Sequence, residues 1–215
     1  MKLIQIITVG VGFLLVFIST AFTLAESEQN KNTKSPLEGY NIVLDPGHGG
    51  KDPGAIGLGG VHEKDFIMPT TYKVAQHLRD AGATVILTRT ADYFVPLGER
   101  IRISNSYNTD AFISLHYNTF PTYTVNGIST FYYTNGNDRK LAHEIQSSLA
   151  ANVPLKNRGI MQGDYRVLRK NSDLAVLLEL GFITNPDDLS TVQTLEFQNG
   201  VAEGIVEGLR SYFSK

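Results

Sequence analysis

Residues 41–60 read NIVLDPGHGGKDPGAIGLGG, and this stretch decides the fold. Its first five residues form a short apolar run with β-branched side chains, which predicts a buried strand. Seven glycines follow between positions 47 and 60. No regular element tolerates that many glycines, so residues 46–62 are expected to form a long loop after the strand.

The glycine pattern differs from both common phosphate-binding loops. A dinucleotide-binding loop needs G-x-G-x-x-G, but Asp52 stands where the third glycine belongs. A P-loop needs Ser or Thr after its Gly-Lys pair, and here Asp52 follows Gly50 and Lys51. These mismatches argue against a nucleotide-binding module and indicate that the loop positions side chains instead.

Strands and helices alternate along the rest of the chain. Further strands are expected at residues 84–88, 111–116, 128–134 and 175–180, and helices at 66–80, 97–108, 138–151 and 195–213. Pro69 is expected in the first turn of its helix, where a proline is tolerated. The alternation predicts a single α/β domain with a mixed, mostly parallel sheet and helices on both faces.

The chain begins with a segment unlike the rest. Lys2 precedes an apolar run that ends at Ala25, a pattern typical of a secretory signal. The run is long for such a signal, so an uncleaved membrane anchor over residues 1–25 is the alternative. Residues 26–38 are mostly polar and are expected to form a flexible linker. Residues 39–215 then form one domain, which either interpretation places outside the cytoplasm.

Composition narrows the classes of function. Lys and Arg total 19 against 21 Asp and Glu, so the charge balance does not suggest the basic surface that a nucleic-acid partner usually requires. The chain has no cysteine. Any metal would therefore be held by His, Asp, Glu or backbone oxygen.

Three predicted strands run into residues that can carry chemistry. His48 follows the first strand, His116 ends the third and Glu179 lies in the last. Active sites of such sheets lie beyond the carboxyl ends of the strands, so these side chains are expected to converge. Together with Glu63, the two histidines form a ligand set known from catalytic zinc sites. Their spacing does not match H-E-x-x-H, so a surface histidine, a carboxylate at a helix start and a core histidine stay open as simpler interpretations.

Glu179 stands in an apolar strand, where an acid is costly unless it is paired or used. One interpretation is a salt bridge to Arg89 or Arg100. The other is a general base and acid whose pKa is tuned by partial burial. The functional interpretation is favoured.

The motifs around these residues resemble one enzyme family. They are VLDPGHGGKDPGAIG (43–57), HEKDF (62–66), FISLHYN (112–118) and LLELGFITNPDD (177–188). In this order, and from residue 40 onward, the chain closely resembles the zinc-dependent N-acetylmuramoyl-L-alanine amidases. The resemblance implies one Zn²⁺ ion held by His48, Glu63 and His116, with Glu179 as the catalytic residue. It also implies hydrolysis of the amide between N-acetylmuramic acid and L-alanine in peptidoglycan.

The chain departs from the family pattern in few places. Ala175 stands where the family commonly has a proline, and the wall-binding repeats of many members are not seen. The segment between His116 and Ile128 is too short for the blocking helix of some members, so the site is expected to be open. The expected partner is peptidoglycan, with a possible membrane tether at the N-terminus and a monomeric protein.

Several interpretations stay open. Asp45 and Asn118 either orient a histidine ligand or make turn and strand-end hydrogen bonds. Tyr117, Phe120 and Tyr123 either stack on substrate or pack in the core. A different zinc hydrolase, such as a peptidase or deacetylase, would use the same metal set. A non-catalytic wall-binding protein is a further alternative, against which a retained catalytic glutamate argues.

Overall fold

The computed structural model describes residues 35–214. The predicted signal or anchor segment and most of the predicted linker lie outside these residues. Within the described part, none of the helices is both long and apolar enough to span a membrane. Residues 36–38 belong to the folded domain and not to the linker, because Leu37 is fully buried in the main core. Its N–H donates to the carbonyl oxygen of Ala81 at 2.9 Å.

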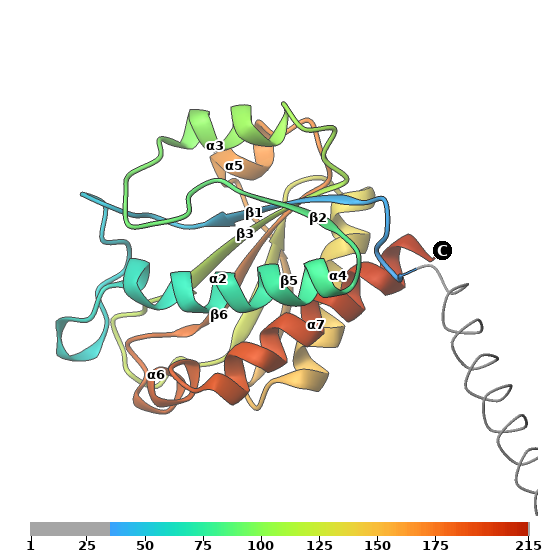
Figure 1. The fold of residues 1–215 in the computed structure, drawn as a ribbon. Helices are drawn as coiled ribbons and strands as arrows, with labels where there is room; N and C mark the ends of the chain where they lie inside the picture. Colours follow the sequence, from blue (N-terminus) through green and yellow to red (C-terminus); the bar gives the residue numbers. More distant parts are fainter. Residues whose placement is uncertain (1–34, 215) are drawn as a thin grey trace, which may run out of the picture. The chain divides into compact units, whose positions relative to one another are not determined.

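A six-stranded sheet forms the centre of the domain (Figure 1). Its strands are β1 (Asn41–Pro46), β2 (Thr84–Leu87), β3 (Ala111–Asn118), β4 (Ile128–Tyr132), β5 (Asn157–Gln162) and β6 (Ala175–Phe182). They lie in the order β2-β1-β3-β6-β4-β5. Neighbours are parallel except β4 and β6, which run antiparallel. The predicted mixed, mostly parallel sheet is therefore confirmed.

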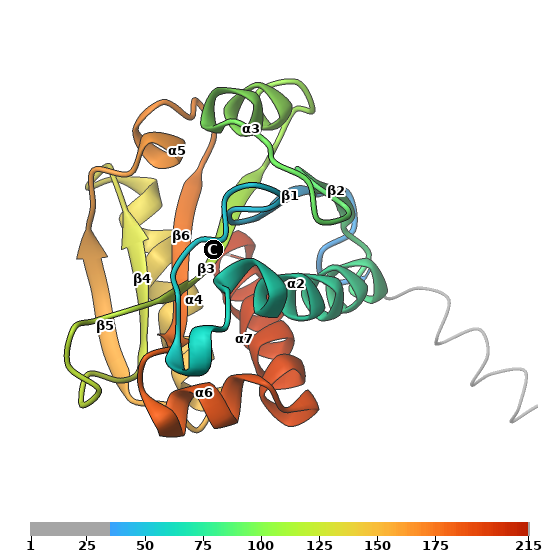
Figure 2. The same ribbon diagram turned by 90° about the vertical axis from the view of Figure 1, so that its left-hand side faces the viewer.

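Helices cover both faces of the sheet, as predicted (Figures 1 and 2). One face carries α2 (Glu63–Asp80), α4 (Asn137–Asn152) and α7 (Leu195–Phe213), and the other carries α3 (Leu97–Ser104) and α5 (Arg166–Arg169). The short elements η1 (Leu58–Gly60) and α6 (Pro186–Val192) complete the chain order. Adjacent residues of one strand supply the two cores, because successive side chains point to opposite faces. In β1, Leu44 packs in the larger core under α2 and α7, and Val43 packs in the smaller one under α3 and α5.

Several predicted boundaries are wrong. Helix α2 begins at Glu63, so Pro69 lies in its interior and not in its first turn. The interior position is tolerable because Pro69 and Asp65, whose carbonyl loses a helical N–H partner, both face solvent. Helix α3 ends at Ser104 and not near residue 108, and β3 continues past His116 to Asn118.

Four elements were not predicted, and one of them, η1, is a single 3₁₀ turn in the stretch that was expected to be loop. Strand β5 lies at the sheet edge and none of its residues is fully buried, so it lacks the apolar alternation of a core strand. Helices α5 and α6 span four and seven residues, which is too short for a helical period to stand out. The elements that carry the four predicted site residues were all expected from the sequence.

Candidate active site

The glycine-rich loop after β1 brings the backbone against two histidine rings. A Cβ at Gly47 would lie 2.2 Å from the His116 ring. A Cβ at Gly54 would lie 2.6 Å from both Glu63 Oε2 and the His48 ring. His48 itself adopts a φ of 57°, a conformation that few non-glycine residues take. The loop therefore positions side chains, as its failed phosphate motifs indicated.

Three predicted ligands meet at the carboxyl ends of β1 and β3. Glu63, the first residue of α2, is almost completely buried and lies between the two imidazoles. Its Oε2 is 3.1 Å from His48 Nε2, and its Oε1 is 2.8 Å from His116 Nδ1. The three ligand atoms lie within 4.8 Å of one another, and no second such group of three occurs among residues 35–214. Two imidazoles and one carboxylate can hold a divalent metal ion here.

The other nitrogen of each imidazole has a fixed partner. His48 Nδ1 is 3.0 Å from Asp52 Oδ2, and His116 Nε2 is 3.2 Å from Ser114 Oγ. Ser114 in turn donates to Asp45 Oδ2 at 2.8 Å. Such contacts fix the tautomer and the ring orientation of metal-ligating histidines. Each ring therefore points its remaining nitrogen, the proposed ligand atom, toward Glu63.

These contacts decide the open interpretations of the neighbouring residues. Asp45 touches neither histidine and reaches His116 only through Ser114. Asn118 accepts from the N–H of Thr119, a strand-end role. Sequence reasoning missed Asp52 as the partner of His48. The available signal was a carboxylate four residues after His48 in a loop built to position side chains.

Two buried arginines hold the backbone of the glycine-rich loop by hydrogen bonds. Arg100 donates to Asp45 Oδ1 and to the carbonyl oxygens of Pro46 and His48, each at 2.7 Å. Arg89 donates to the carbonyl oxygens of Pro46 and Gly47. Both arginine side chains are buried, and neither contacts Glu179. The salt bridge considered for Glu179 is therefore wrong, because both arginines are used to fix the loop.

Glu179 is a buried carboxylate without a complete set of partners. It pairs in register with His116 across β3 and β6, and only 8% of it is exposed. Its Oε2 is buried and accepts no hydrogen bond, the only such side-chain atom among the described residues. Burial penalises the charged form and raises the pKa of Glu179 to about 7. A carboxyl group with that pKa can both accept and donate a proton near neutral pH.

The ligand group is strongly coupled in the absence of a metal. Burial alone would lower the pKa of His48, but Glu63 and Asp52 raise it to about 9. Burial would raise the pKa of Glu63, yet hydrogen bonds from His116 and His48 hold it far below its usual range. A metal ion that binds here must displace protons from the histidines, so its affinity depends on pH.

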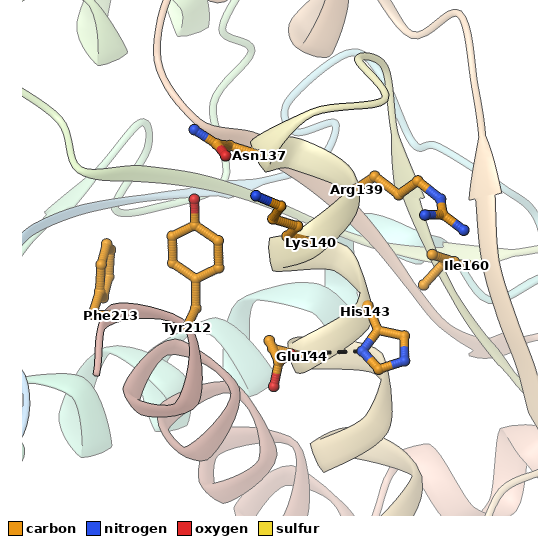
Figure 3. Close-up of a pocket in the computed structure, with 8 residues that line it drawn as sticks. All are labelled: Asn137, Arg139, Lys140, His143, Glu144, Ile160, Tyr212 and Phe213. Carbon is orange, nitrogen blue, oxygen red and sulfur yellow. Dashed lines mark ion pairs between the residues drawn. The ribbon is translucent and has the colours of Figure 1, made fainter. Parts of the chain in front are cut away.

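A cavity of about 370 Å³ opens beside His48 and His116. Its walls are largely apolar, which is typical of small-molecule sites, and they include Phe94, Leu97 and Val167. A larger hollow of about 680 Å³ lies along α4, near β5 and the end of α7 (Figure 3). It contains a histidine and a glutamate but no metal-ligand group, so the smaller cavity is the candidate active site.

The three aromatic residues near His116 have different surroundings. Tyr117 is buried, and its hydroxyl lies 2.8 Å from Thr70 Oγ1, so it packs in the core. Phe120 and Tyr123 are exposed, at 48% and 61%. These two remain available for contact with a ligand.

Known proteins share this sequence pattern and this geometry. A family model described as N-acetylmuramoyl-L-alanine amidase matches residues 42–211. The chain is 34% identical to protein YqiI of Bacillus subtilis over 204 residues, covering 94% of this chain and 97% of that protein. It is 38% identical over 187 residues to the probable cell wall amidase LytH of Staphylococcus aureus, covering 86% of this chain but only 62% of that relative.

A solved structure has the same fold. N-acetylmuramoyl-L-alanine amidase AmiC2 of Nostoc punctiforme superposes with a TM-score of 0.78 at 39% identity, covering 82% of this chain and 98% of that one. The family match spans β1 to α7 and therefore includes the glycine-rich loop, the three candidate ligands and Glu179. With sequence, fold and site geometry in agreement, the chain belongs to the N-acetylmuramoyl-L-alanine amidase family.

Proposed function

We propose that this chain is a zinc hydrolase that cuts the amide between N-acetylmuramic acid and L-alanine in peptidoglycan. One observation carries the proposal: the unpaired, buried oxygen of Glu179 lies on the strand next to His116 of the three-ligand group. Buried polar atoms normally have partners, so an orphaned carboxylate oxygen at a family active site points to a chemical role.

The donor set fits zinc. The chain offers His48 Nε2, His116 Nδ1 and a Glu63 oxygen, and catalytic zinc sites commonly use three such ligands and leave a position open. The orienting contacts from Asp52 and Ser114 are those expected behind zinc-bound histidines. When bound, zinc supplies Lewis-acid polarisation of the carbonyl and lowers the pKa of water.

Glu179 carries the proton. Its Oε2 takes a proton from the attacking water and then delivers it to the nitrogen of the departing L-alanine. In the metal-free protein burial raises the pKa of Glu179 to about 7, and a bound cation nearby would favour the ionised form that accepts the first proton. Proton transfer by a positioned group typically contributes ~10²–10⁴-fold to the rate.

The location follows from the substrate. Peptidoglycan lies outside the cytoplasm, so the domain acts there, and residues 1–25 serve as its secretory signal or membrane anchor. Residues 26–35 then act as a tether between that segment and the domain. A monomer is sufficient for this reaction, because the proposed ligands His48, Glu63 and His116 and the proton carrier Glu179 belong to one chain.

The test is product analysis. The purified protein is incubated with peptidoglycan in the presence of zinc or of a chelator, and the released fragments are identified by mass spectrometry. Zinc-dependent release of stem peptides with a free L-alanine amine, leaving intact muramic acid, is expected. Other fragments would indicate a peptidase or deacetylase, and binding without release would indicate a wall-binding protein.

A further inference from the structure

An arginine without a partner lies at the rim of the active-site cavity. Arg166, the first residue of α5, lines the cavity and is exposed. Its guanidinium makes no hydrogen bond or ion pair with any residue in the described part of the chain. Arg169, three residues later, instead pairs with Asp164 at 3.0 Å and does not line the cavity. Arg166 is therefore free to bind a ligand.

The charge balance at the cavity favours an anionic ligand. The two acids that line it are already engaged, Asp45 by Arg100 and Asp52 by His48. Lys51 adds positive charge at the mouth, where its Nζ lies 4.8 Å from the ring centroid of Phe94. The positive charge of Arg166 consequently has no neutralising acid within the cavity lining.

The position of Arg166 indicates which half of the substrate it meets. In the proposed function, Glu179 protonates the leaving nitrogen, so the departing peptide lies on its side of the site. Tyr165, directly before Arg166, also lines the cavity. Its ring packs edge-on against Phe131 of β4, which pairs with Leu177, two residues before Glu179 on β6. Leu177, Tyr165 and Arg166 all line the cavity, so its wall leads from the strand of Glu179 to Arg166.

We propose that Arg166 binds the free carboxylate of the acidic second residue of the stem peptide, D-glutamate, and makes the enzyme prefer that acid over its amide. This specificity rests on the proposed function. A guanidinium pairs with a carboxylate through two parallel hydrogen bonds. The amide offers no charge and one oxygen only, and its NH₂ group would face another donor. Arg166 thus selects for the charge state one residue beyond the scissile amide.

The test compares two small substrates that differ only in this group. The zinc-loaded full-length protein is given muramyl-L-alanyl-D-glutamate and muramyl-L-alanyl-D-isoglutamine, each with its γ-carboxyl group blocked as a methylamide so that only the α-carboxyl group differs. The wild type is expected to cleave the acid with a kcat/KM ~10- to 100-fold higher, the range of a hydrogen bond to a charged group. Arg166→Gln should lose this preference through a higher KM for the acid, with the amide unchanged. Arg169→Gln, the matched control, should keep it.

Equal cleavage of both substrates by the wild type, or an unchanged ratio in Arg166→Gln, would overturn the assignment. A second measurement separates failure of this specificity from failure of the proposed function. Calorimetry measures how tightly each substrate binds to Glu179→Gln protein, with and without the additional change Arg166→Gln. If neither substrate is cleaved but the acid still binds more tightly through Arg166, the specificity stands and the reaction is wrong. If binding shows no preference, the specificity is wrong whatever the reaction.

Discussion

Two buried carboxylates lie on strands of the same sheet, and their surroundings differ. Asp45 on β1 accepts hydrogen bonds from Thr88, Arg100 and Ser114 at 2.6 to 2.8 Å. Glu179 on β6 is buried nearly as well, yet its Oε2 accepts none. A satisfied buried network rigidifies its surroundings, whereas an unsatisfied group costs free energy. The contrast indicates that Asp45 holds the loop, whereas Glu179 keeps an oxygen free for the proposed proton transfer.

The comparison is tested most severely by removing the acid function of Glu179. Glu179→Gln should lower the rate of hydrolysis ~10²–10⁴-fold, the range for a lost proton carrier, while zinc content stays unchanged. His48→Ala should lose both activity and zinc, because it removes a proposed ligand. Turnover is measured on peptidoglycan and zinc by elemental analysis of the purified proteins. Full activity in zinc-loaded Glu179→Gln would remove Glu179 from the mechanism.

At Asp45 the expected effect is a loss of stability. Asp45→Asn leaves the buried Arg100 without its counter-charge, and breaking such a pair costs about 3–5 kcal/mol. The free energy of unfolding is measured by urea denaturation of the metal-free protein. Glu99→Gln is the control, since Glu99 pairs with Arg102 at the surface and should change stability little. A similarly small effect at Asp45 would show that the buried network does not hold the loop.

Glu179 should also destabilise the fold when it is ionised. Its pKa rises from an ordinary 4.5 to about 7 on folding, so the folded state retains a proton that the unfolded chain has lost. Stability therefore falls as pH rises from about 4.5 through 7, by about 3 kcal/mol in total. Glu179→Gln removes this loss and should be the more stable protein at pH 8, with a smaller difference at pH 5.

Urea denaturation of both proteins at the two pH values, with zinc removed by a chelator, measures this difference. A wild type as stable as Glu179→Gln at pH 8 would mean that Glu179 finds a partner when charged. In that case Glu179 would be a satisfied buried carboxylate like Asp45.

Much of the fold was predictable because its core elements have strong apolar patterns. Helix α7 matches the expected residues 195–213, and β1 differs from its prediction by one residue. Strand β5 was missed because an edge strand that is half exposed carries little pattern, and Gly159 interrupts it with a φ of 83°. Short or solvent-facing elements depend on their neighbours more than on their own residues.

The site was predictable where motifs mark it and not where loop geometry decides. The three candidate ligands and Glu179 stand in recognisable motifs, and the structure brings the ligands together. The partner of His48 was missed because the turn back to Asp52 depends on positive φ angles at His48, Gly49 and Gly50. The hydrogen bonds from Arg100 to the carbonyl oxygens of the loop could not be predicted either, because they join the side chain of an α3 residue to a loop more than 50 residues earlier in the chain.

The smallest effect is expected at Asp52, which orients His48 without holding the metal. Asp52→Asn should weaken zinc binding ~10- to 100-fold, as removal of an orienting partner typically does. The affinity is measured by competition with a fluorescent chelator. Zinc needs a neutral imidazole, and the pKa of metal-free His48 is raised to about 9, so wild-type affinity should weaken as pH falls below that value. Because Asp52 is one cause of the raised pKa, the affinity of the variant should begin to weaken only at a lower pH.

A second histidine–carboxylate pair supplies the control. His62 Nδ1 lies 3.8 Å from Asp65 Oδ2 on the exposed start of α2, outside the proposed ligand set. Asp65→Asn should therefore leave zinc affinity and its pH dependence unchanged. If Asp52→Asn behaves like Asp65→Asn, the hydrogen bond to Asp52 does not set the tautomer of His48. The orientation of the His48 ring would then come from the strained loop backbone alone. Asp52 would be neither a structural carboxylate like Asp45 nor a reactive one like Glu179.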